Sequence, residues 1–241
     1  MTTGIRTALI TGANRGIGLE LTKQLTAKGY FVFMGVRDVV KGAEALQALP
    51  FPDRAAVVAL DVNDPASVHR AVEEIAQASE SLQILVNNAG VMMDGDFMKD
   101  STTDIAAESL RKTFDTNFFG LVELTNKALP LLLKSEQASV LNISSNMGSL
   151  QMHSREEPLA RTFAYNASKA AVNMYTIHLA NALKGRQVRV NAVHPGWVKT
   201  DMGSEYAPLE VHEAVGPLVD FLLQEDAPTG KFMFRGEEVA W

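Results

Sequence analysis

Short runs of apolar residues recur along the chain, and apolar and polar positions do not alternate within them. Strands that are covered on both faces read as continuous apolar stretches, so these runs predict the strands of a buried parallel sheet. Six runs are well defined, at 7–11, 31–35, 55–60, 83–87, 138–143 and 188–193, and a shorter seventh lies at 231–234.

Helical spacing replaces this pattern between the runs. One helix is predicted after the first strand and another after Asp64-Pro65, where aspartate is a favourable N-cap and proline a favourable first helical residue. Further helices are predicted from about 110 to 133, with Pro130 bending the last turns, around Tyr165 and Lys169, and from about 209 to 223. The stretches at 94–104 and 146–158 are polar, and we expect loops there.

This alternation predicts the fold class. Single strands that alternate with single helices indicate an α/β protein with a Rossmann-type, doubly wound parallel sheet of about seven strands and helices on both faces. The sequence has no internal linker, low-complexity tract or short repeat. We therefore expect a single domain over residues 1–241, with a loop at about 196–216 that follows the sixth strand.

Composition and charge narrow the classes of partner. The formal net charge is −6 and no run of lysine and arginine occurs, which argues against nucleic acid and anionic lipid. The chain has no cysteine and no H-x-x-x-H spacing, so we expect no thiolate chemistry and no metal site. No apolar run is long enough to cross a bilayer, and the first is too short for the core of a signal peptide. We expect a cytoplasmic protein that acts on a small molecule and has no membrane partner.

The turn after the first strand is rich in glycine. Glycine permits a sharp turn and a close approach to a ligand, and the helix start that follows presents free N–H groups and a positive dipole end to phosphate. This favours a dinucleotide pyrophosphate site, although the spacing differs from G-x-G-x-x-G and a tight strand-to-helix turn is the alternative. The residues concerned are Gly12, Asn14, Arg15, Gly16, Ile17 and Gly18.

The end of the second strand bears on the choice of dinucleotide. In a doubly wound sheet this position meets the adenosine ribose, and an acidic residue there would bind the 2′-hydroxyl of NAD. Here Arg37 occupies it, and Arg37 with Arg15 offers two guanidinium groups for a 2′-phosphate. We therefore expect NADPH/NADP+ as the cofactor, with NADH the less favoured alternative because Asp38 is adjacent. Solvated surface arginines are the competing interpretation.

Two further strand ends carry candidate cofactor contacts. Asp61 and Val62 follow the third strand, where a carboxylate can meet an adenine amino group, although a turn-forming aspartate is nearly as common. The small residues after the fourth strand allow backbone to lie against a cofactor, and their alternative is an ordinary turn. These residues are Asn88, Ala89 and Gly90.

Four side chains are candidates for chemistry. Tyr165 and Lys169 are four residues apart and share a helical face, so the ammonium is expected to favour the phenolate and lower the phenol pKa. Asn117 lies among apolar helical positions, where an amide needs a hydrogen-bonding partner. Ser145, like Ser144, follows the fifth strand at the edge where α/β sheets bind ligands. No G-x-S-x-G motif surrounds these serines, so a hydrolase is not expected.

Taken together, the motifs resemble those of the short-chain dehydrogenase/reductase family. They are T-G-x-x-x-G-x-G, N-N-A-G, a helical asparagine, S-S-x-x-G, Y-x-x-x-K and P-G-x-x-x-T, in this order from Thr11 to Thr200. The glycine loop, the Val36-Arg37-Asp38 ending and the segment from His194 to Asp201 are most similar to the branch of carbonyl reductases, sniffer-type reductases and C-factor-like proteins.

The resemblance implies roles for these positions. Tyr165 would protonate the carbonyl oxygen of the substrate. Lys169 would lower the pKa of the Tyr165 phenol and bind the nicotinamide ribose. Ser145 rather than Ser144 would hold the substrate oxygen. Asn117 would anchor a water in a proton relay to Lys169. The nicotinamide and phosphate side would be lined by Pro195, Gly196, Val198 and Thr200.

The expected function follows from these roles. It is an NADPH-dependent oxidoreductase that reduces an aldehyde or ketone to an alcohol in an NAD(P)-binding Rossmann domain, with the substrate loop at 196–216. The alternative is a C-factor-like signalling or regulatory protein that keeps the dinucleotide site. The resemblance also implies a homodimer or homotetramer, but the stretch between Ser145 and Tyr165 is longer than in most members, which bears on the geometry of assembly.

Overall fold

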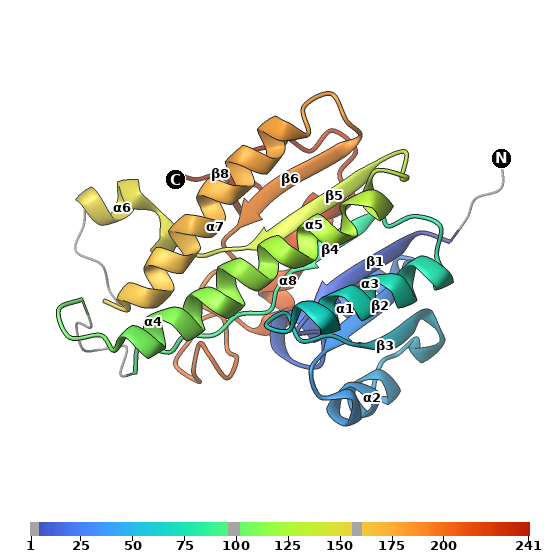
Figure 1. Cartoon of the computed structure of the whole chain (residues 1–241), viewed down its shortest axis with the longest axis horizontal. Coiled ribbons are helices and arrows are strands. Elements are labelled where there is room, and N and C mark those ends of the chain that lie inside the picture. Colours follow the sequence, from blue (N-terminus) through green and yellow to red (C-terminus); the bar gives the residue numbers. More distant parts are fainter. Residues whose placement is uncertain (1–4, 96–101, 156–160) are drawn as a thin grey trace.

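Eight strands form one sheet at the centre of the computed structural model, which describes residues 5–95, 102–155 and 161–241 (Figure 1). The order across the sheet is β3-β2-β1-β4-β5-β6-β7-β8. Neighbouring strands from β3 to β7 are parallel, and β8 is antiparallel to β7. The strands are β1 (Thr7–Thr11), β2 (Phe31–Val36), β3 (Ala55–Ala59), β4 (Ile84–Asn87), β5 (Ala138–Ile143), β6 (Val188–Val193), β7 (Phe232–Phe234) and β8 (Glu237–Glu238).

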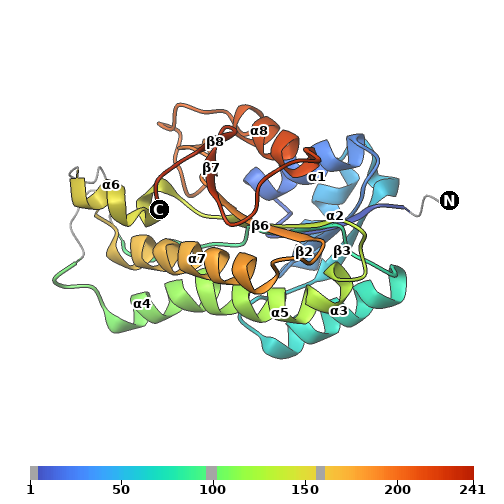
Figure 2. The same ribbon diagram turned by 90° about the horizontal axis from the view of Figure 1, so that it is seen from above.

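Helices cover both faces of the sheet (Figure 2). One core packs α1, α2 and α8 against one face, and a second core packs α3, α5 and α7 against the other. Within β1 the two faces alternate, since Ala8 and Ile10 belong to the first core and Leu9 to the second. The helices are α1 (Gly16–Ala27), α2 (Val39–Gln47), α3 (Pro65–Ala78), α4 (Ala107–Phe114), α5 (Gly120–Leu132), α6 (Leu150–Arg155), α7 (Phe163–Ala182) and α8 (Val211–Leu223).

The doubly wound α/β fold is therefore confirmed, with one strand more than expected. The additional strand, β8, is only two residues long and is reached through Gly236 at a φ of +86°. Its residues, Glu237 and Glu238, are charged and carry no apolar pattern, so sequence periodicity does not reveal it. The expected helix start at Asp64-Pro65 is confirmed, since the Asp64 carboxylate accepts the Ala66 N–H at 2.9 Å.

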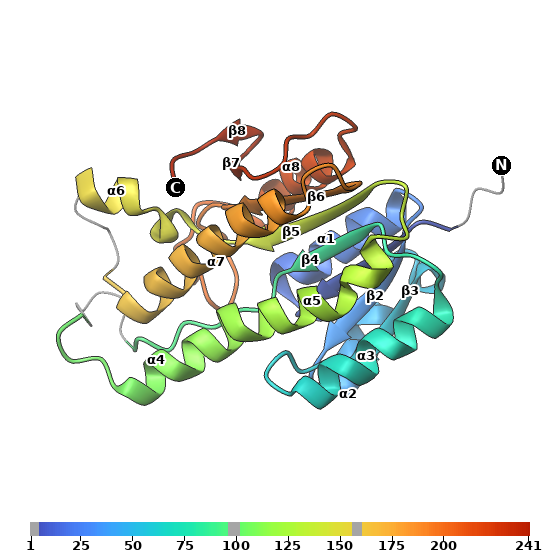
Figure 3. The ribbon, with the colours of Figure 1, turned by 45° about the horizontal axis from the view of Figure 1, so that its top comes forward.

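The long helix expected from 110 to 133 is interrupted. A π-helical segment, Asp115–Phe119, separates α4 from α5, and Figure 3 shows the two helices nearly end to end beside α7. Such wide turns gather at functional sites. The interruption places Asn117 on the widened turn, where its side chain bonds to backbone of another segment.

The expected loop at 146–158 is partly helical. It contains the 3-10 turn η3 (Asn146–Gly148) and α6 before residues 156–160, which lie outside the described residues. The expected connection at 94–104 likewise includes residues 96–101, which lie outside them. Sequence pattern misses η3 and α6 because both are short and polar, and they depend on contacts with distant segments.

Two features are absent from the described part of the chain. None of its helices is long and apolar enough to cross a bilayer. No group of three or more histidine, cysteine, aspartate or glutamate side chains within it is arranged to hold a metal ion.

Packing at two helical glycines should give opposite effects on stability. A Cβ at Gly120 would lie 2.5 Å from the Val62 carbonyl oxygen, whereas a Cβ at Gly216 would have nothing within 4 Å beyond its chain neighbours and its own helix backbone. Gly120→Ala should therefore lower the free energy of unfolding by about 2 kcal/mol, since backbone must move to admit the methyl group. Gly216→Ala should raise it by up to about 1 kcal/mol, through helix propensity alone. Urea denaturation of both variants checks the pair, and equal effects would contradict the packing.

Burial of His194 should make the fold sensitive to acid. The ring stacks on Phe234 with centroids 4.9 Å apart, and its Nδ1 accepts the Gly196 N–H at 3.3 Å. Burial lowers the pKa of His194 from 6.5 to about 4. Between these values the unfolded chain binds a proton that the folded chain does not, so stability falls as the pH drops through this window.

His194→Gln should remove this acid sensitivity. The wild type is expected to lose on the order of 2 kcal/mol more than the variant between pH 7 and pH 4.5. Urea unfolding at the two pH values measures the difference. The matched control is His69→Gln, because His69 lies on the exposed side of α3 beside Glu73. A wild type and His194 variant with parallel pH profiles would refute the assignment.

Candidate active site

The candidate residues gather at one edge of the sheet. β1 has β2 on one side and β4 on the other, so the chain winds outward in both directions from this point. In open parallel sheets such a switch in strand order opens a crevice at the carboxyl ends of the strands. The glycine loop after β1, the small residues after β4 and the serines after β5 all lie at these ends.

The glycine loop has the backbone expected of a phosphate cradle. Gly12 and Gly16 have φ values of +64° and +52°, which other residues adopt rarely. A Cβ at Gly18 would lie 2.4 Å from the Gly12 carbonyl oxygen, so only glycine fits there. The N-cap of α1, Arg15, makes no side-chain cap. The first N–H groups of this helix are thus available to an anion.

Other predicted contacts hold this loop in place. The Asn88 amide donates to the Thr11 carbonyl at 2.7 Å, and the Ala89 N–H donates to the Thr11 hydroxyl at 2.8 Å. On the opposite side, a Cβ at Gly16 would lie 3.3 Å from the Thr200 methyl group. The Ile17 side chain packs against the first core.

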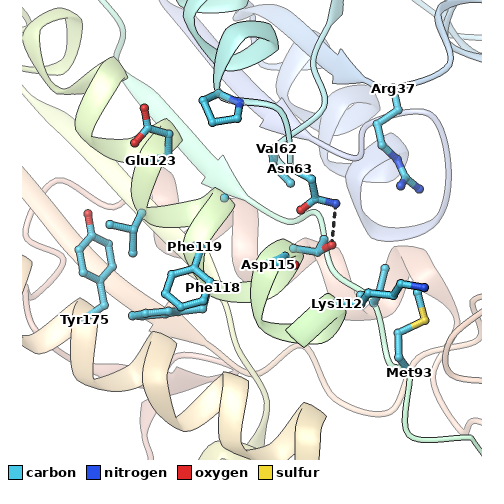
Figure 4. Close-up of a pocket in the computed structure, with 15 residues that line it drawn as sticks. Arg37, Val62, Asn63, Met93, Lys112, Asp115, Phe118, Phe119, Glu123 and Tyr175 are labelled. Atoms are coloured by element: carbon cyan, nitrogen blue, oxygen red, sulfur yellow. Dashed lines mark hydrogen bonds between the residues drawn. The ribbon is translucent and has the colours of Figure 1, made fainter. Parts of the chain in front are cut away.

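The two arginines expected at the ribose end have different surroundings. Arg15 forms an exposed ion pair with Asp201. Arg37 lines a pocket of about 800 Å³ together with Val62, Asn63 and others (Figure 4). The Asp38 carboxylate accepts the Val40 and Lys41 N–H groups, both at 3.1 Å, as the N-cap of α2. Arg37 therefore lines this pocket, whereas the side chain of Arg15 is paired with Asp201 in the segment after β6.

This pocket continues from Arg37 along the interrupted helix. In Figure 4, Arg37 and Lys112 lie at one end and Phe118, Phe119 and Tyr175 at the other. Asn63 donates to the Thr116 hydroxyl at 3.0 Å between them. The Asp61 carboxylate accepts the Asn63 N–H at 2.9 Å and so forms a turn, while its contact with an adenine stays a prediction.

Asn117 and Lys169 face each other across Gly90. A Cβ at Gly90 would lie 3.5 Å from Asn117 Oδ1 and 3.8 Å from Lys169 Nζ. The Asn117 amide accepts the Val91 N–H at 2.8 Å and donates to the Val91 carbonyl at 2.9 Å and to the Ser168 hydroxyl at 3.0 Å. The predicted hydrogen bonding of this buried amide is confirmed.

Lys169 is buried beside the fifth strand. Its ammonium donates to the Ile143 carbonyl at 2.7 Å, and its Nζ lies 5.5 Å from the centroid of the Tyr165 ring. Burial lowers the pKa of Lys169 to about 8. The lysine is therefore still mostly protonated at neutral pH.

The expected lowering of the phenol pKa is wrong for this geometry. Burial raises the pKa of Tyr165 to about 12, and a hydrogen bond with the Ser145 side chain opposes this only in part. The Lys169 ammonium donates to the Ile143 carbonyl, and burial is the largest influence on the phenol pKa. Tyr165 is thus a neutral phenol that can donate a proton.

The two serines after β5 have separate partners. Ser144 is buried and donates to Asn173 Oδ1 at 2.6 Å, so its hydroxyl points into the interface with α7. Ser145 accepts the Met147 N–H at 3.1 Å and is the serine that interacts with Tyr165. Ser145 is therefore the hydroxyl beside the phenol.

One residue that positions the site was missed in the sequence. The Asp94 carboxylate accepts the N–H groups of Ala164 and Tyr165, at 2.7 and 3.0 Å, and so caps the start of α7. Caps are normally sought immediately before a helix. Asp94 is 71 residues from Tyr165 in sequence, and no local signal marks this role.

The segment after β6 folds back on itself. Gly196 has a φ of +94°, and a Cβ there would lie 2.4 Å from a Leu209 methyl group. Val198 pairs with Leu209 in an isolated bridge, and the Trp197 indole donates to the Gly203 carbonyl. Pro195 begins this turn. The predicted substrate loop is thus closed at its base by backbone pairing.

Comparison with known proteins identifies relatives along nearly the whole chain. The family model of the short chain dehydrogenases matches residues 6–210. A (+)-neomenthol dehydrogenase from Capsicum annuum is 30% identical over 308 aligned positions, which cover 98% of each chain. Salutaridine reductase from Papaver bracteatum is 31% identical, over 95% of this chain and 94% of the relative. Both alignments are longer than the 241 residues of this chain, so these relatives carry insertions.

Solved structures give the same assignment. NADPH-bound carbonyl reductase from chicken fatty liver superposes with a TM-score of 0.88 at 30% identity, over 98% of this chain and 99% of that chain. Carbonyl reductase Sniffer of D. melanogaster has a TM-score of 0.88 at 29% identity, over 99% and 100%. The chain therefore belongs to the short-chain dehydrogenase family, in its carbonyl reductase branch, and is an oxidoreductase acting on carbonyl or alcohol groups.

Proposed function

We propose that the chain is an NADPH-dependent reductase that converts an aldehyde or ketone to an alcohol. The observation that carries this proposal is the set of Tyr165, Ser145, Lys169 and Asn117 beside a glycine loop at the carboxyl edge of the sheet. The NADPH bound to the similar carbonyl reductase from chicken fatty liver supports the choice of cofactor. A purely regulatory protein, the alternative expected from sequence, has no need of a proton donor.

The chain's own residues fit a dinucleotide. The glycine loop leaves a backbone cradle at the start of α1, which suits a pyrophosphate, and Gly90 leaves room between Asn117 and Lys169. Pro195, Gly196, Val198 and Thr200 would line the nicotinamide side. The bound dinucleotide would supply hydride to the carbonyl carbon.

The proton would come from Tyr165. Its raised pKa keeps the phenol protonated at neutral pH, which is the form needed to deliver a proton to the carbonyl oxygen. The Ser145 hydroxyl would hold the same oxygen and so orient the carbonyl toward the phenol. Because charge develops on this oxygen during reduction, both hydroxyl groups would stabilise the transition state more than the bound substrate.

Lys169 and Asn117 would restore the proton. The ammonium has three donors, and only one of them is used by the Ile143 carbonyl. The others would bind the cofactor ribose and stabilise the phenolate that remains after transfer. Asn117 would anchor a water that relays a proton to Lys169. The Asn117 side chain also fixes the nearby Val91 backbone through two hydrogen bonds.

Exposed apolar side chains suggest the kind of substrate. Met93, Trp197 and Met202 are each more than two-fifths exposed and lie on segments next to the carboxyl edge. Flexible thioethers and an indole suit an apolar, variable carbonyl compound.

Tyr165→Phe should abolish turnover, because the phenyl ring keeps the packing and removes the proton. We expect kcat for a panel of aldehydes and ketones to fall by at least about a thousandfold. NADPH binding, measured by quenching of protein fluorescence, should change little, and this also serves as the control for folding. Retention of wild-type turnover would exclude Tyr165 as the acid. A wild type that binds NADPH but reduces no carbonyl would favour the regulatory alternative.

Arg37 should set the preference for NADPH over NADH. Arg37→Gln removes a charge-assisted contact to the 2′-phosphate, so kcat/KM with NADPH should fall about ten- to a hundredfold while that with NADH stays nearly unchanged. Arg70→Gln, on the exposed side of α3, is the matched control. Steady-state kinetics with both cofactors decides the point, and a wild type that prefers NADH would overturn it.

A further inference from the structure

The turn that carries Ser145 has two carbonyl groups that it does not satisfy by itself. Ser145 is the N-cap of η3, with its hydroxyl 3.1 Å from the Met147 N–H. Within the turn, Gly148 donates its N–H to the Ser145 carbonyl at 2.9 Å and Ser149 to the Asn146 carbonyl at 3.0 Å. The last carbonyls of any helical turn lack donors of this kind, so those of Met147 and Gly148 need partners from elsewhere.

Side chains of two helices supply these partners. His153 of α6 places Nε2 2.8 Å from the Met147 carbonyl, which requires a proton on that nitrogen. Asn173 of α7 donates its amide to the Gly148 carbonyl at 3.2 Å. Every carbonyl from Ser145 to Gly148 thereby has a donor.

Asn173 also holds the residue on the other side of Ser145. Its Oδ1 accepts the Ser144 hydroxyl at 2.6 Å, while its Nδ2 binds Gly148. The Asn173 side chain is almost completely buried, at 4% exposure, and both ends of its amide are hydrogen bonded. A single side chain thus spans the turn and fixes it before and after Ser145.

The turn with Ser145 also packs directly on α7, the helix that carries Tyr165 and Lys169. A Cβ at Gly148 would lie 2.6 Å from the Lys169 carbonyl carbon, so the turn rests directly on α7. Tyr165, Lys169 and Asn173 are spaced four residues apart on that helix and share one face. The face that presents the phenol and the ammonium therefore also anchors the turn with the serine.

We propose that Asn173 is a positioning residue that fixes the Ser145 hydroxyl relative to the Tyr165 phenol. The inference rests on the proposed reduction, in which Ser145 holds the substrate oxygen. Asn173 touches neither the glycine loop nor the pocket at Arg37. Its loss should therefore impair the chemical step and leave binding of the dinucleotide intact.

Asn173→Asp tests the proposal with almost no change in shape. Aspartate keeps an oxygen for the Ser144 hydroxyl and puts a second oxygen, without a proton to donate, against the Gly148 carbonyl. We expect kcat for a carbonyl substrate to fall about tenfold or more. The Kd for NADPH, measured by fluorescence, should stay within about twofold. The control is Asn181→Asp, which makes the same change on the exposed end of α7 and should leave both values unchanged.

Amide hydrogen exchange gives a readout that does not depend on catalysis. The N–H groups of Met147, Gly148 and Ser149 should exchange faster in Asn173→Asp than in the wild type or in Asn181→Asp. If the wild type reduces no carbonyl, the proposed function fails, while exchange still shows whether Asn173 holds the turn. A folded Asn173→Asp protein with unchanged kcat and unchanged exchange would overturn the inference. So would an equal loss of NADPH binding, which indicates a general structural role.

His153→Ala tests the same turn from α6, should Asn173→Asp fail to fold. Removing the ring leaves the Met147 carbonyl without its donor. The expected result is again a lower kcat with an unchanged Kd for NADPH, and an unchanged kcat would count against the proposal.

Discussion

The buried ammonium group of Lys169 is the constraint on which the site depends. A cation with 4% exposure is costly unless it is hydrogen bonded, and here it donates a hydrogen bond to the Ile143 carbonyl at the end of β5. That bond ties α7 to the centre of the sheet. Gly148 then lets its turn approach the lysine backbone more closely than any larger residue would allow, and Gly90 lies on the other side, next to the ammonium. The position of the phenol follows from this arrangement, because Tyr165 is one turn away on the same helix.

Patterns that depend on neighbouring residues were predictive. The bounds of β1, β5 and β6 agree with the apolar runs. These strands are covered on both faces, so nearly every residue in them is buried and apolar residues are favoured throughout. The cap at Asp64 and the positive φ values of Gly12 and Gly16 follow from local backbone chemistry in the same way.

Features that depend on distant contacts were not predictable. The π-helical turn carries Asn117, whose side chain is hydrogen bonded to the backbone of Val91. The carbonyl groups of η3 are hydrogen bonded to the side chains of His153 and Asn173. Asp94 caps a helix far along the chain, and Arg15 pairs with Asp201, which is also far from it in sequence. The pKa of Tyr165 moved opposite to expectation for the same reason: spacing places a lysine nearby, but only the fold determines how deeply the phenol is buried.

The short strand β8 bears on how copies of the chain can meet. An outermost strand usually offers unpaired N–H and C=O groups on which another chain can extend the sheet. Here the outermost strand beyond β7 has two residues, Glu237 and Glu238, both exposed and charged, and Lys231 pairs with Glu238 across it. Two chains brought together along this edge would oppose carboxylates over a very short ladder. The sheet is therefore protected from edge-to-edge aggregation on this side.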